Sequence, residues 1–274
     1  MFEEYLRQGE PNQTEKANLW KTAIGLQEVD GLKPSQYLID TARENIEGYL
    51  TFAEVKQRLD GYYQQLAVRD ESRTEEADKV SARIAEMLSE KTFGFSISEY
   101  LSIHRRLFQG IYPDAGQLRT FNISKKEWIL NGETVLYGSA DSLKETLEYD
   151  FEREKKFSYK GLNQTQIIEH LALFIADLWQ IHPFSEGNTR TTAIFLIKYL
   201  RKLGYKQANN AQFEQHAWYF RNALVRANFE DLSRGIYRTN EFLIKFFDNW
   251  LFDKNEPLKN REMRIELAKH NQQE

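Results

Sequence analysis

Cysteine is absent from the chain, so disulfide bonds and thiolate chemistry are excluded, and this absence is compatible with a reducing compartment. No charge of one sign dominates either. The 37 basic and 41 acidic residues give a net charge of −4, which favours neither nucleic acid nor an anionic membrane surface as a partner. No apolar run reaches the roughly 20 residues that span a bilayer, and the first residues lack the pattern of a secretion signal. We therefore expect a cytoplasmic protein that contains no membrane segment.

Proline is scarce as well, with 5 in 274 residues, whereas the helix-favouring residues Leu, Lys, Glu and Gln are common. Hydroxyl residues followed three positions later by glutamate mark helix starts at Thr51 and Ser96, and Ser35 precedes another amphipathic segment. The sequence therefore predicts an all-α fold. The predicted helices cover residues 13–27, 35–47, 52–66, 73–90, 97–109, 139–157, 164–181, 188–203, 213–229, 239–252 and 257–270.

A polar segment over residues 66–72 carries no capping signal and separates two predicted groups of helices. We place three parts along the chain on this basis. Residues 1–68 form a small three-helix module, residues 69–253 form the main helical body, and residues 254–274 form a polar helical tail.

One segment departs from the helical pattern. Within residues 126–137, β-branched and aromatic residues flank Asn131 and Gly132, and this dipeptide favours the two-residue type I′ turn of a β-hairpin. An isolated hairpin is marginally stable in water, so this one must lean on the helical body. The sequence therefore predicts one short β-hairpin, which is either a surface excursion or a binding element.

The most informative segment covers residues 181–190, where a short polar stretch separates two largely apolar helices. Pro183 cannot donate a backbone hydrogen bond and disfavours helix at the residue before it, so the first helix should end at His182. The imidazole of His182 titrates near neutral pH and is the natural general base of the segment. The apolar ring of Phe184 is expected to anchor the loop in the core.

Further residues of this segment suit a phosphate and a metal ion. Gly187 lets a ligand approach the backbone, and a helix that begins at Asn188 presents unpaired N–H groups to an anion. Glu186 can hold Mg²⁺, which proteins typically bind with one or two carboxylates together with substrate phosphates. Arg190 can bind a phosphate through its planar guanidinium. Each residue also has a structural alternative: a histidine that only hydrogen-bonds, a surface Glu–Arg ion pair, or an asparagine helix cap.

This order and spacing resemble the signature of Fic domains, H-P-F-x-D/E-G-N-G-R-x-x-R, except that Thr189 replaces the second glycine and Ala193 replaces the last arginine. The stretch from residue 103 to residue 119 resembles the segment before the flap of these domains, so the resemblance covers about residues 96–250. It implies a Fic-type helical bundle with one short β-hairpin flap. It also implies Mg²⁺-dependent transfer of AMP from ATP to a Ser, Thr or Tyr hydroxyl of a protein, with release of pyrophosphate.

The resemblance implies a role for each matching residue. His182 is implied to deprotonate the target hydroxyl, and Glu186 to bind the metal ion. The implied phosphate cradle consists of Gly187, Asn188, Thr189 and Arg190. The implied flap residues, which pair with an extended target segment by strand addition, are Ile129, Leu130, Asn131, Gly132 and Thr134.

The two departures from the signature affect the phosphates. Thr189 adds a side chain but keeps its backbone N–H, so we expect an altered but usable cradle. Ala193 removes an arginine that the family is implied to place on the γ-phosphate, and losing one charge-assisted contact costs about 1.5–3 kcal/mol of binding.

The upstream module resembles the small three-helix antitoxin that blocks Fic toxins. Family inhibitors carry a glutamate, followed by Gly or Asn, that pairs with the last arginine of the signature. The best match is Asp30-Gly31, with Glu47-Gly48 as a second candidate, and both lack the hydroxyl residue expected four positions earlier. Because Asp30 replaces the glutamate and Ala193 replaces the arginine, we expect Asp30 to lack that partner and to have little regulatory effect. The alternative is a plain packing module.

The leading hypothesis is therefore a protein adenylyltransferase that uses ATP and Mg²⁺. One alternative is Fic-type transfer of a different nucleotide or phosphate-containing moiety. Another is a catalytically weak protein-binding module, which Ala193 favours. The expected partners are a nucleoside triphosphate and a target protein. Nucleic acid is not expected, because no helix concentrates Lys and Arg on one face. The oligomeric state, including a homo-oligomer, stays open.

Overall fold

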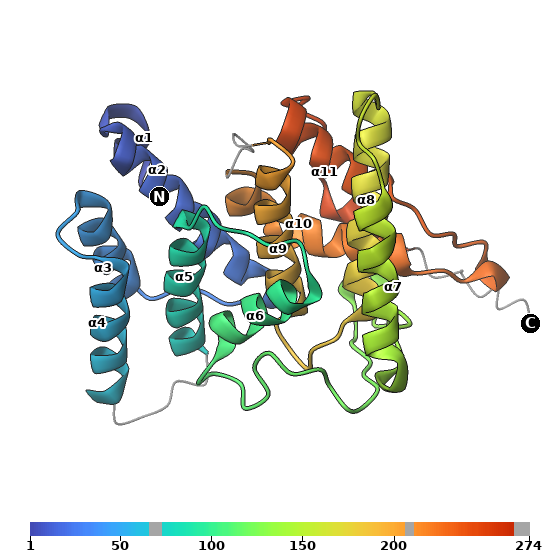
Figure 1. Ribbon diagram of the computed structural model, residues 1–274, viewed down its shortest axis with the longest axis horizontal. Helices are drawn as coiled ribbons and strands as arrows, with labels where there is room; N and C mark the ends of the chain where they lie inside the picture. The colour runs from blue at the N-terminus through green and yellow to red at the C-terminus, as the bar shows by residue number, and fades with distance from the viewer. Residues whose placement is uncertain (66–72, 206–210, 266–274) are drawn as a thin grey trace, which may run out of the picture. The chain divides into compact units, whose positions relative to one another are not determined.

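The computed structural model describes residues 1–65, 73–205 and 211–265, and it confirms the predicted all-α class (Figure 1). In this described part, β-pairing is limited to two isolated bridges. The α-helices are α1 (Glu3–Gln8), α2 (Pro11–Gly25), α3 (Gln36–Glu47), α4 (Phe52–Gln65), α5 (Thr74–Ser89), α6 (Ile97–Phe108), α7 (Leu143–Lys156), α8 (Gln164–Ile181), α9 (Asn188–Lys202), α10 (Ala211–Asn228) and α11 (Glu241–Phe252).

Helix ends follow the local signals in the sequence. The Ser35 hydroxyl accepts a hydrogen bond from the Leu38 N–H (3.0 Å) at the start of α3, and Gly48 ends that helix with a φ of 87°. The Thr51 N–H donates to the Glu54 carboxylate (2.7 Å), as a capping box requires. Helix α1 was not predicted, because its 6 residues are too few to show a hydrophobic period.

The chain divides into two compact units. One comprises residues 1–117 and 189–218, and the other comprises residues 118–188 and 219–274. The division runs within α10 and just after the first residue of α9. The boundary predicted at residues 66–72 lies outside the described residues, so the predicted three-part organisation of the chain stays a prediction.

In the first unit, α5 packs against α2, α4 and α6 (Figure 1). Basic side chains of α9 cap the C-terminal end of α5. The Lys198 ammonium donates to the Met87 carbonyl (2.9 Å), and the Arg201 guanidinium donates to the Leu88 carbonyl (2.5 Å). Positive charge is favourable at the C-terminal end of a helix dipole. These contacts fix α9 to the end of α5.

A buried carboxylate fastens the N-terminal helices to α5. Asp78 of α5 accepts hydrogen bonds from the N–H of Ser35 (2.8 Å), which caps α3, and from the hydroxyl of Tyr63 (2.6 Å) in α4. Burial raises the pKa of Asp78, although these donors oppose the shift. One side chain thus joins three helices of the N-terminal region.

In the second unit, α8 packs against α7 and α11. The Asn228 side chain, at the end of α10, donates to the Ala176 carbonyl of α8 (2.9 Å). Much of α8 is apolar and buried, as expected for a central helix. Among the described helices, none combines the length and apolarity needed to cross a membrane.

The predicted β-hairpin is correct in its turn and wrong in its strands. Asn131 and Gly132 adopt the positive φ values that a type I′ turn requires, 55° and 92°. The Glu133 N–H donates to the Leu130 carbonyl (3.1 Å) and closes the turn. The residues just before the turn, Trp128–Leu130, form a 3₁₀ turn, and the structure assigns no strand to residues 126–137, which we call the flap loop.

The physical reason lies in two consecutive apolar residues. Ile129 and Leu130 are both fully buried. Neighbouring side chains of a strand point to opposite faces, so a strand leaning on the helical body buries only one of each pair. A 3₁₀ turn can bury both. The demand for burial therefore overrides the strand propensity of this segment.

The predicted helix over residues 257–270 is wrong in its described part. Residues Asn260–Met263 form a single 3₁₀ turn, and Arg264 is extended with φ −69° and ψ 127°. Met263 and Ile265 are buried whereas Arg264 between them is exposed, which is the period of an extended chain. Residues 266–274 lie outside the described residues.

Asp150 of α7 generates a test of stability against pH. Burial raises the pKa of this carboxyl to about 6, although Arg153, 3.6 Å away, opposes the shift. Between the ordinary pKa of 3.8 and 6 the folded state binds more protons than the unfolded state, so the free energy of unfolding falls as pH rises. We expect Asp150→Asn to stabilise the protein by roughly 1 kcal/mol at alkaline pH and not in acid. Urea denaturation at both pH values measures this, with exposed Glu148→Gln as the control. An equal effect at both pH values contradicts the prediction.

Candidate active site

Helix α8 ends where the sequence predicted. His182 takes a left-handed conformation with φ 50°, and its N–H donates to the Trp179 carbonyl (3.1 Å). A non-glycine residue rarely adopts positive φ, so the surroundings must hold this one in place. Pro183 follows and cannot continue the helix. The chain therefore turns at the histidine that the sequence singled out as the base.

The imidazole of His182 is held in one tautomer. Its Nδ1 lies 3.1 Å from the Trp179 carbonyl oxygen, which can only accept a hydrogen bond. Nδ1 therefore carries the proton, and Nε2 keeps its lone pair. The Tyr137 ring packs 4.2 Å from the imidazole, centroid to centroid. The side chain is 3% exposed. Burial, followed by the positive charge of Lys125, lowers the pKa of His182 well below 6.5, so the ring is neutral near pH 7.

Arg119 fixes the backbone around this histidine. Its buried guanidinium donates to the His182 carbonyl (2.8 Å) and to the carbonyls of Phe121 (2.5 Å) and Gly138. Its backbone N–H donates to the Pro183 carbonyl (2.9 Å). The sequence placed Arg119 in a stretch resembling Fic proteins but assigned it no role. Arg119 therefore joins the backbone at the end of α8 to the backbone at Phe121 and at Gly138.

Glu186 is the accessible carboxylate of the loop. Its side chain is 50% exposed, and the Lys125 ammonium pairs with it (Nζ–Oε2 2.8 Å). Lys125 begins the segment that leads into the flap loop, and its backbone N–H donates to the Thr134 hydroxyl (3.0 Å). Sequence reasoning missed this lysine, because nothing local links residues so far apart. A metal ion at Glu186 would compete with the ammonium for the carboxylate.

The residues after Glu186 form a closed loop at the start of α9. The Asn188 side chain accepts from the Phe184 N–H (3.0 Å) and donates to the Phe184 carbonyl (2.8 Å). Gly187 takes a φ of 75°, which glycine adopts without strain. Phe184 is fully buried, as predicted. The Asn188 side chain is thus occupied within the loop, and its contribution to a phosphate site would come from its backbone.

Arg190 is the centre of a buried ionic cluster in the first unit. Its guanidinium is 0% exposed and pairs with Asp30 (Nε–Oδ2 2.8 Å) and Glu76 (Nη2–Oε1 2.7 Å). It donates to the Gln27 side chain (3.0 Å) and to the Tyr112 hydroxyl (3.2 Å). Burial alone would lower the pKa of Arg190, but Asp30, Tyr112 and Glu76 outweigh it and raise the pKa.

This cluster changes the interpretation of Asp30. The sequence predicted that Asp30 lacks a partner at position 193, and Ala193 is indeed a fully buried apolar residue. The partner of Asp30 is instead the first arginine of the signature, Arg190. Sequence reasoning missed Glu76 of α5, the other carboxylate on this arginine, because an acidic residue in the first turn of a helix is common. Arg190 is therefore already paired with two carboxylates of the protein.

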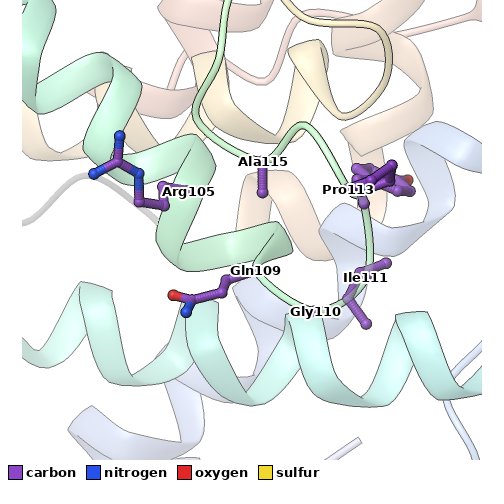
Figure 2. A pocket seen from close by; sticks show the side chains of 7 residues that line it. Arg105, Gln109, Gly110, Ile111, Pro113 and Ala115 are labelled. Atoms are coloured by element: carbon purple, nitrogen blue, oxygen red, sulfur yellow. The ribbon is translucent and has the colours of Figure 1, made fainter.

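A pocket of about 490 Å³ lies beside this cluster, at the end of α6 (Figure 2). It is lined by Arg105, Gln109, Gly110, Ile111, Tyr112, Pro113 and Ala115. Tyr112 belongs both to this lining and to the cluster, since its hydroxyl donates to Glu76 (2.6 Å). None of the residues predicted for the site lines this pocket.

The predicted residues are divided between the two units. His182, Glu186, Gly187, Asn188 and the flap residues Ile129 to Thr134 belong to the second unit, whereas Asp30, Thr189 and Arg190 belong to the first. Within the described residues, no three His, Asp or Glu side chains are arranged to hold a metal ion by themselves. A half-exposed single carboxylate, Glu186, fits Mg²⁺ that takes its other ligands from phosphates and water.

The signature lies within a recognisable domain, since residues 94–200 match the Fic/DOC family. The chain contains a Fic/DOC domain. This match covers α6, the flap loop, α7, α8, the loop around His182 and most of α9. The N-terminal helices precede the matched Fic/DOC residues, so the resemblance of that module to an antitoxin stays a prediction.

Proteins similar to this chain carry an enzymatic name. It is 26% identical over 231 residues to protein adenylyltransferase VbhT of Bartonella schoenbuchensis, covering 75% of this chain but only 45% of VbhT. It is 28% identical over 173 residues to the probable protein adenylyltransferase y4lH of Sinorhizobium fredii, covering 61% of this chain and 82% of that protein. A crystal structure of a Fic family protein from Desulfovibrio desulfuricans G20 has a TM-score of 0.56 and 13% identity, covering 91% of this chain and 68% of that one. This last likeness supports the fold alone.

The closed loop around Asn188 generates a test by a nearly isosteric change. Asn188→Asp replaces the amide N–H₂ that faces the Phe184 carbonyl with a carboxylate oxygen, and oxygen then faces oxygen in a buried site. We expect a loss of roughly 2 kcal/mol in the free energy of unfolding, at least as large as for Asn188→Ala. Chemical denaturation measures it, and Glu186→Gln, a change at an exposed position of the same loop, is the control. A smaller loss for Asp than for Ala contradicts this account.

Proposed function

We propose that this Fic/DOC protein transfers AMP from ATP to a Ser, Thr or Tyr hydroxyl of a protein. In this reaction the hydroxyl oxygen forms a bond to the α-phosphorus of ATP. The bond between that phosphorus and the oxygen bridging to the β-phosphate breaks, and pyrophosphate leaves. The hydroxyl proton passes to Nε2 of His182. The relatives named adenylyltransferases support AMP as the group transferred.

The state of His182 is the observation that carries the proposal. A general base must be neutral and must offer a lone pair to the proton it accepts. Burial keeps this imidazole neutral, and the Trp179 carbonyl holds the proton on Nδ1, so Nε2 is the accepting atom. Arg119 and Tyr137 restrict the backbone and the ring.

The phosphate and metal roles follow from the loop. Glu186 would hold Mg²⁺, which neutralises charge on the phosphates when bound. The backbone at Gly187 and at the start of α9 is the proposed phosphate cradle, because the positive end of a helix dipole favours an anion. The cradle role of Arg190 requires an exchange, since the arginine must replace a carboxylate partner by a phosphate.

Removal of the proposed base tests the function directly. We expect His182→Ala to lower AMP transfer by about 10²–10⁴-fold while nucleotide affinity stays nearly unchanged, because the base acts on the hydroxyl and not on the phosphates. Labelled ATP with Mg²⁺, followed by intact-mass analysis for modified protein, measures transfer, and calorimetry measures affinity. His170→Ala, a change at another histidine of α8, is the control. Transfer by the His182 variant at the wild-type rate would falsify the mechanism.

Removal of the carboxylate tests the metal role. We expect Glu186→Ala to weaken ATP binding in Mg²⁺ by about tenfold, and to leave binding in EDTA unchanged or slightly stronger, because a negative charge near the phosphates is lost. Calorimetric titration with and without Mg²⁺ gives both values. Glu133→Ala, a change at a carboxylate of the flap loop, is the matched control. Equal weakening in both conditions removes Glu186 from the metal site.

The ion pair of Asp30 supports a restraint on Arg190 by the N-terminal module. We expect Asp30→Asn to tighten ATP binding by about tenfold, equivalent to ~1.4 kcal/mol, because it removes a carboxylate that competes with phosphate for the guanidinium. Calorimetry measures the change. Asp30 ends a 3₁₀ turn, Leu26–Asp30, and Glu28→Gln, at an exposed position of this turn, should leave affinity unchanged. An unaltered affinity in the Asp30 variant would mean that the pair only stabilises the fold.

Ala193 favours a second candidate, transfer of a different nucleotide or phosphate-containing group. The position is fully buried, so an arginine there would need surrounding side chains to move. Without that arginine the γ-phosphate loses one implied contact. Parallel incubation with ATP, GTP, CTP and UTP distinguishes the candidates by the mass added to the protein.

A further inference from the structure

The flap loop is already paired with another segment of the chain. The Ile265 N–H donates to the Ile129 carbonyl (2.9 Å), and the Asn131 side chain donates to the Ile265 carbonyl (2.7 Å). The flap loop thus binds both the backbone N–H and the backbone carbonyl of Ile265. This residue belongs to the C-terminal segment, residues 260–265, which follows α11 by several residues.

The side chains of the C-terminal segment add to this backbone pairing. Ile265 is 6% exposed, so its aliphatic side chain is enclosed. The Arg264 guanidinium lies 5.6 Å from the Trp128 ring centroid and donates to the Asn131 side-chain oxygen (2.9 Å). The amide of Asn131 therefore contacts both residues of the Arg264-Ile265 dipeptide, accepting from one and donating to the other.

These contacts would allow the loop to recognise an extended peptide. Pairing through one backbone N–H and one backbone carbonyl does not depend on the identity of the residue that supplies them. The enclosed site of Ile265 adds a preference for an aliphatic side chain. The indole of Trp128 and the oxygen of Asn131 add a preference for a cation just before it. The loop is thus complementary to a basic residue followed by an aliphatic residue in an extended backbone.

We infer that the edge of the flap loop formed by Trp128, Ile129 and Asn131 is a docking surface for an extended basic–aliphatic peptide, and that Arg264-Ile265 occupies it in cis. As regards the target protein, this inference rests on the proposed function, in which the docked peptide belongs to the substrate. A tethered segment competes at an effective concentration on the order of millimolar. A free peptide therefore binds well only after the C-terminal segment has left.

Peptide binding to the full-length chain tests the inference. The probe is a fluorescent peptide with the sequence of residues 259–266. Ile265→Asp in the chain places a carboxylate in the enclosed aliphatic site and releases the C-terminal segment. We expect this variant to bind the peptide at least about tenfold more tightly than the wild-type chain does. Asn131→Ala added to the Ile265 variant should abolish the gain, and so should the same Ile-to-Asp change in the peptide. Equal binding by variant and wild type, or binding by neither, overturns the inference.

Amide hydrogen exchange gives a second test that does not depend on the Ile265 variant. The Ile265 amide should be protected in the wild-type chain, and Asn131→Ala should raise its exchange rate at least about tenfold without lowering the melting temperature by more than a few degrees. Arg261→Ala, a change at an exposed arginine of the same segment, is the matched control and should leave the rate unchanged. Rapid exchange in the wild-type chain overturns the inference. Neither measurement involves nucleotide, so a chain that binds peptide but transfers no AMP keeps the docking surface and refutes only the proposed function.

Discussion

The requirement that buried backbone groups find partners governs the structure around His182. The chain turns there between two largely apolar helices, where water cannot satisfy the carbonyls at the end of α8. A single guanidinium, that of Arg119, reaches two of these carbonyls, those of Ile181 and His182, and the side chain of Asn188 closes the loop from the other end. The geometry of the proposed base is a consequence of this arrangement. A polar residue with five donors is placed where the backbone has acceptors to spare.

Local patterns predicted the helices because they depend on local physics. The hydroxyl of Ser35 caps α3, and the glycine at position 48 ends it, through contacts within a few residues. The proline at 183 ended α8 for the same reason. The loop of the candidate site was predictable because its residues are contiguous. Patterns failed where distant residues decide the conformation. Ile129 and Leu130 have strand propensity, but their joint burial made a 3₁₀ turn.

The same distinction separates the site residues found from those missed. The partners of Arg190 come from residues 27, 30, 76 and 112, and no sequence spacing brings them together. The ion pair between Lys125 and Glu186 likewise depends on the fold. The prediction that Asp30 lacks a partner considered position 193 alone, because the Fic signature places the paired arginine there. The fold decides which carboxylates lie beside a buried arginine. Ala193 replaces the last arginine of the signature, but Arg190, the first, remains and pairs with Asp30.

Burial also makes the Arg190 cluster insensitive to ionic strength. Exposed ion pairs such as Lys144 with Glu148, whose side chains are 74% and 53% exposed, are screened by dissolved salt. The guanidinium of Arg190 is enclosed, so counterions have no access to it and screening is weak. Concentrated salt would therefore weaken the surface ion pairs, while the ion pair between Asp30 and Arg190 of α9 persisted. The cellular salt concentration is thus no signal for releasing this arginine, and only a ligand able to enter the site and offer an equivalent negative charge can replace its carboxylates.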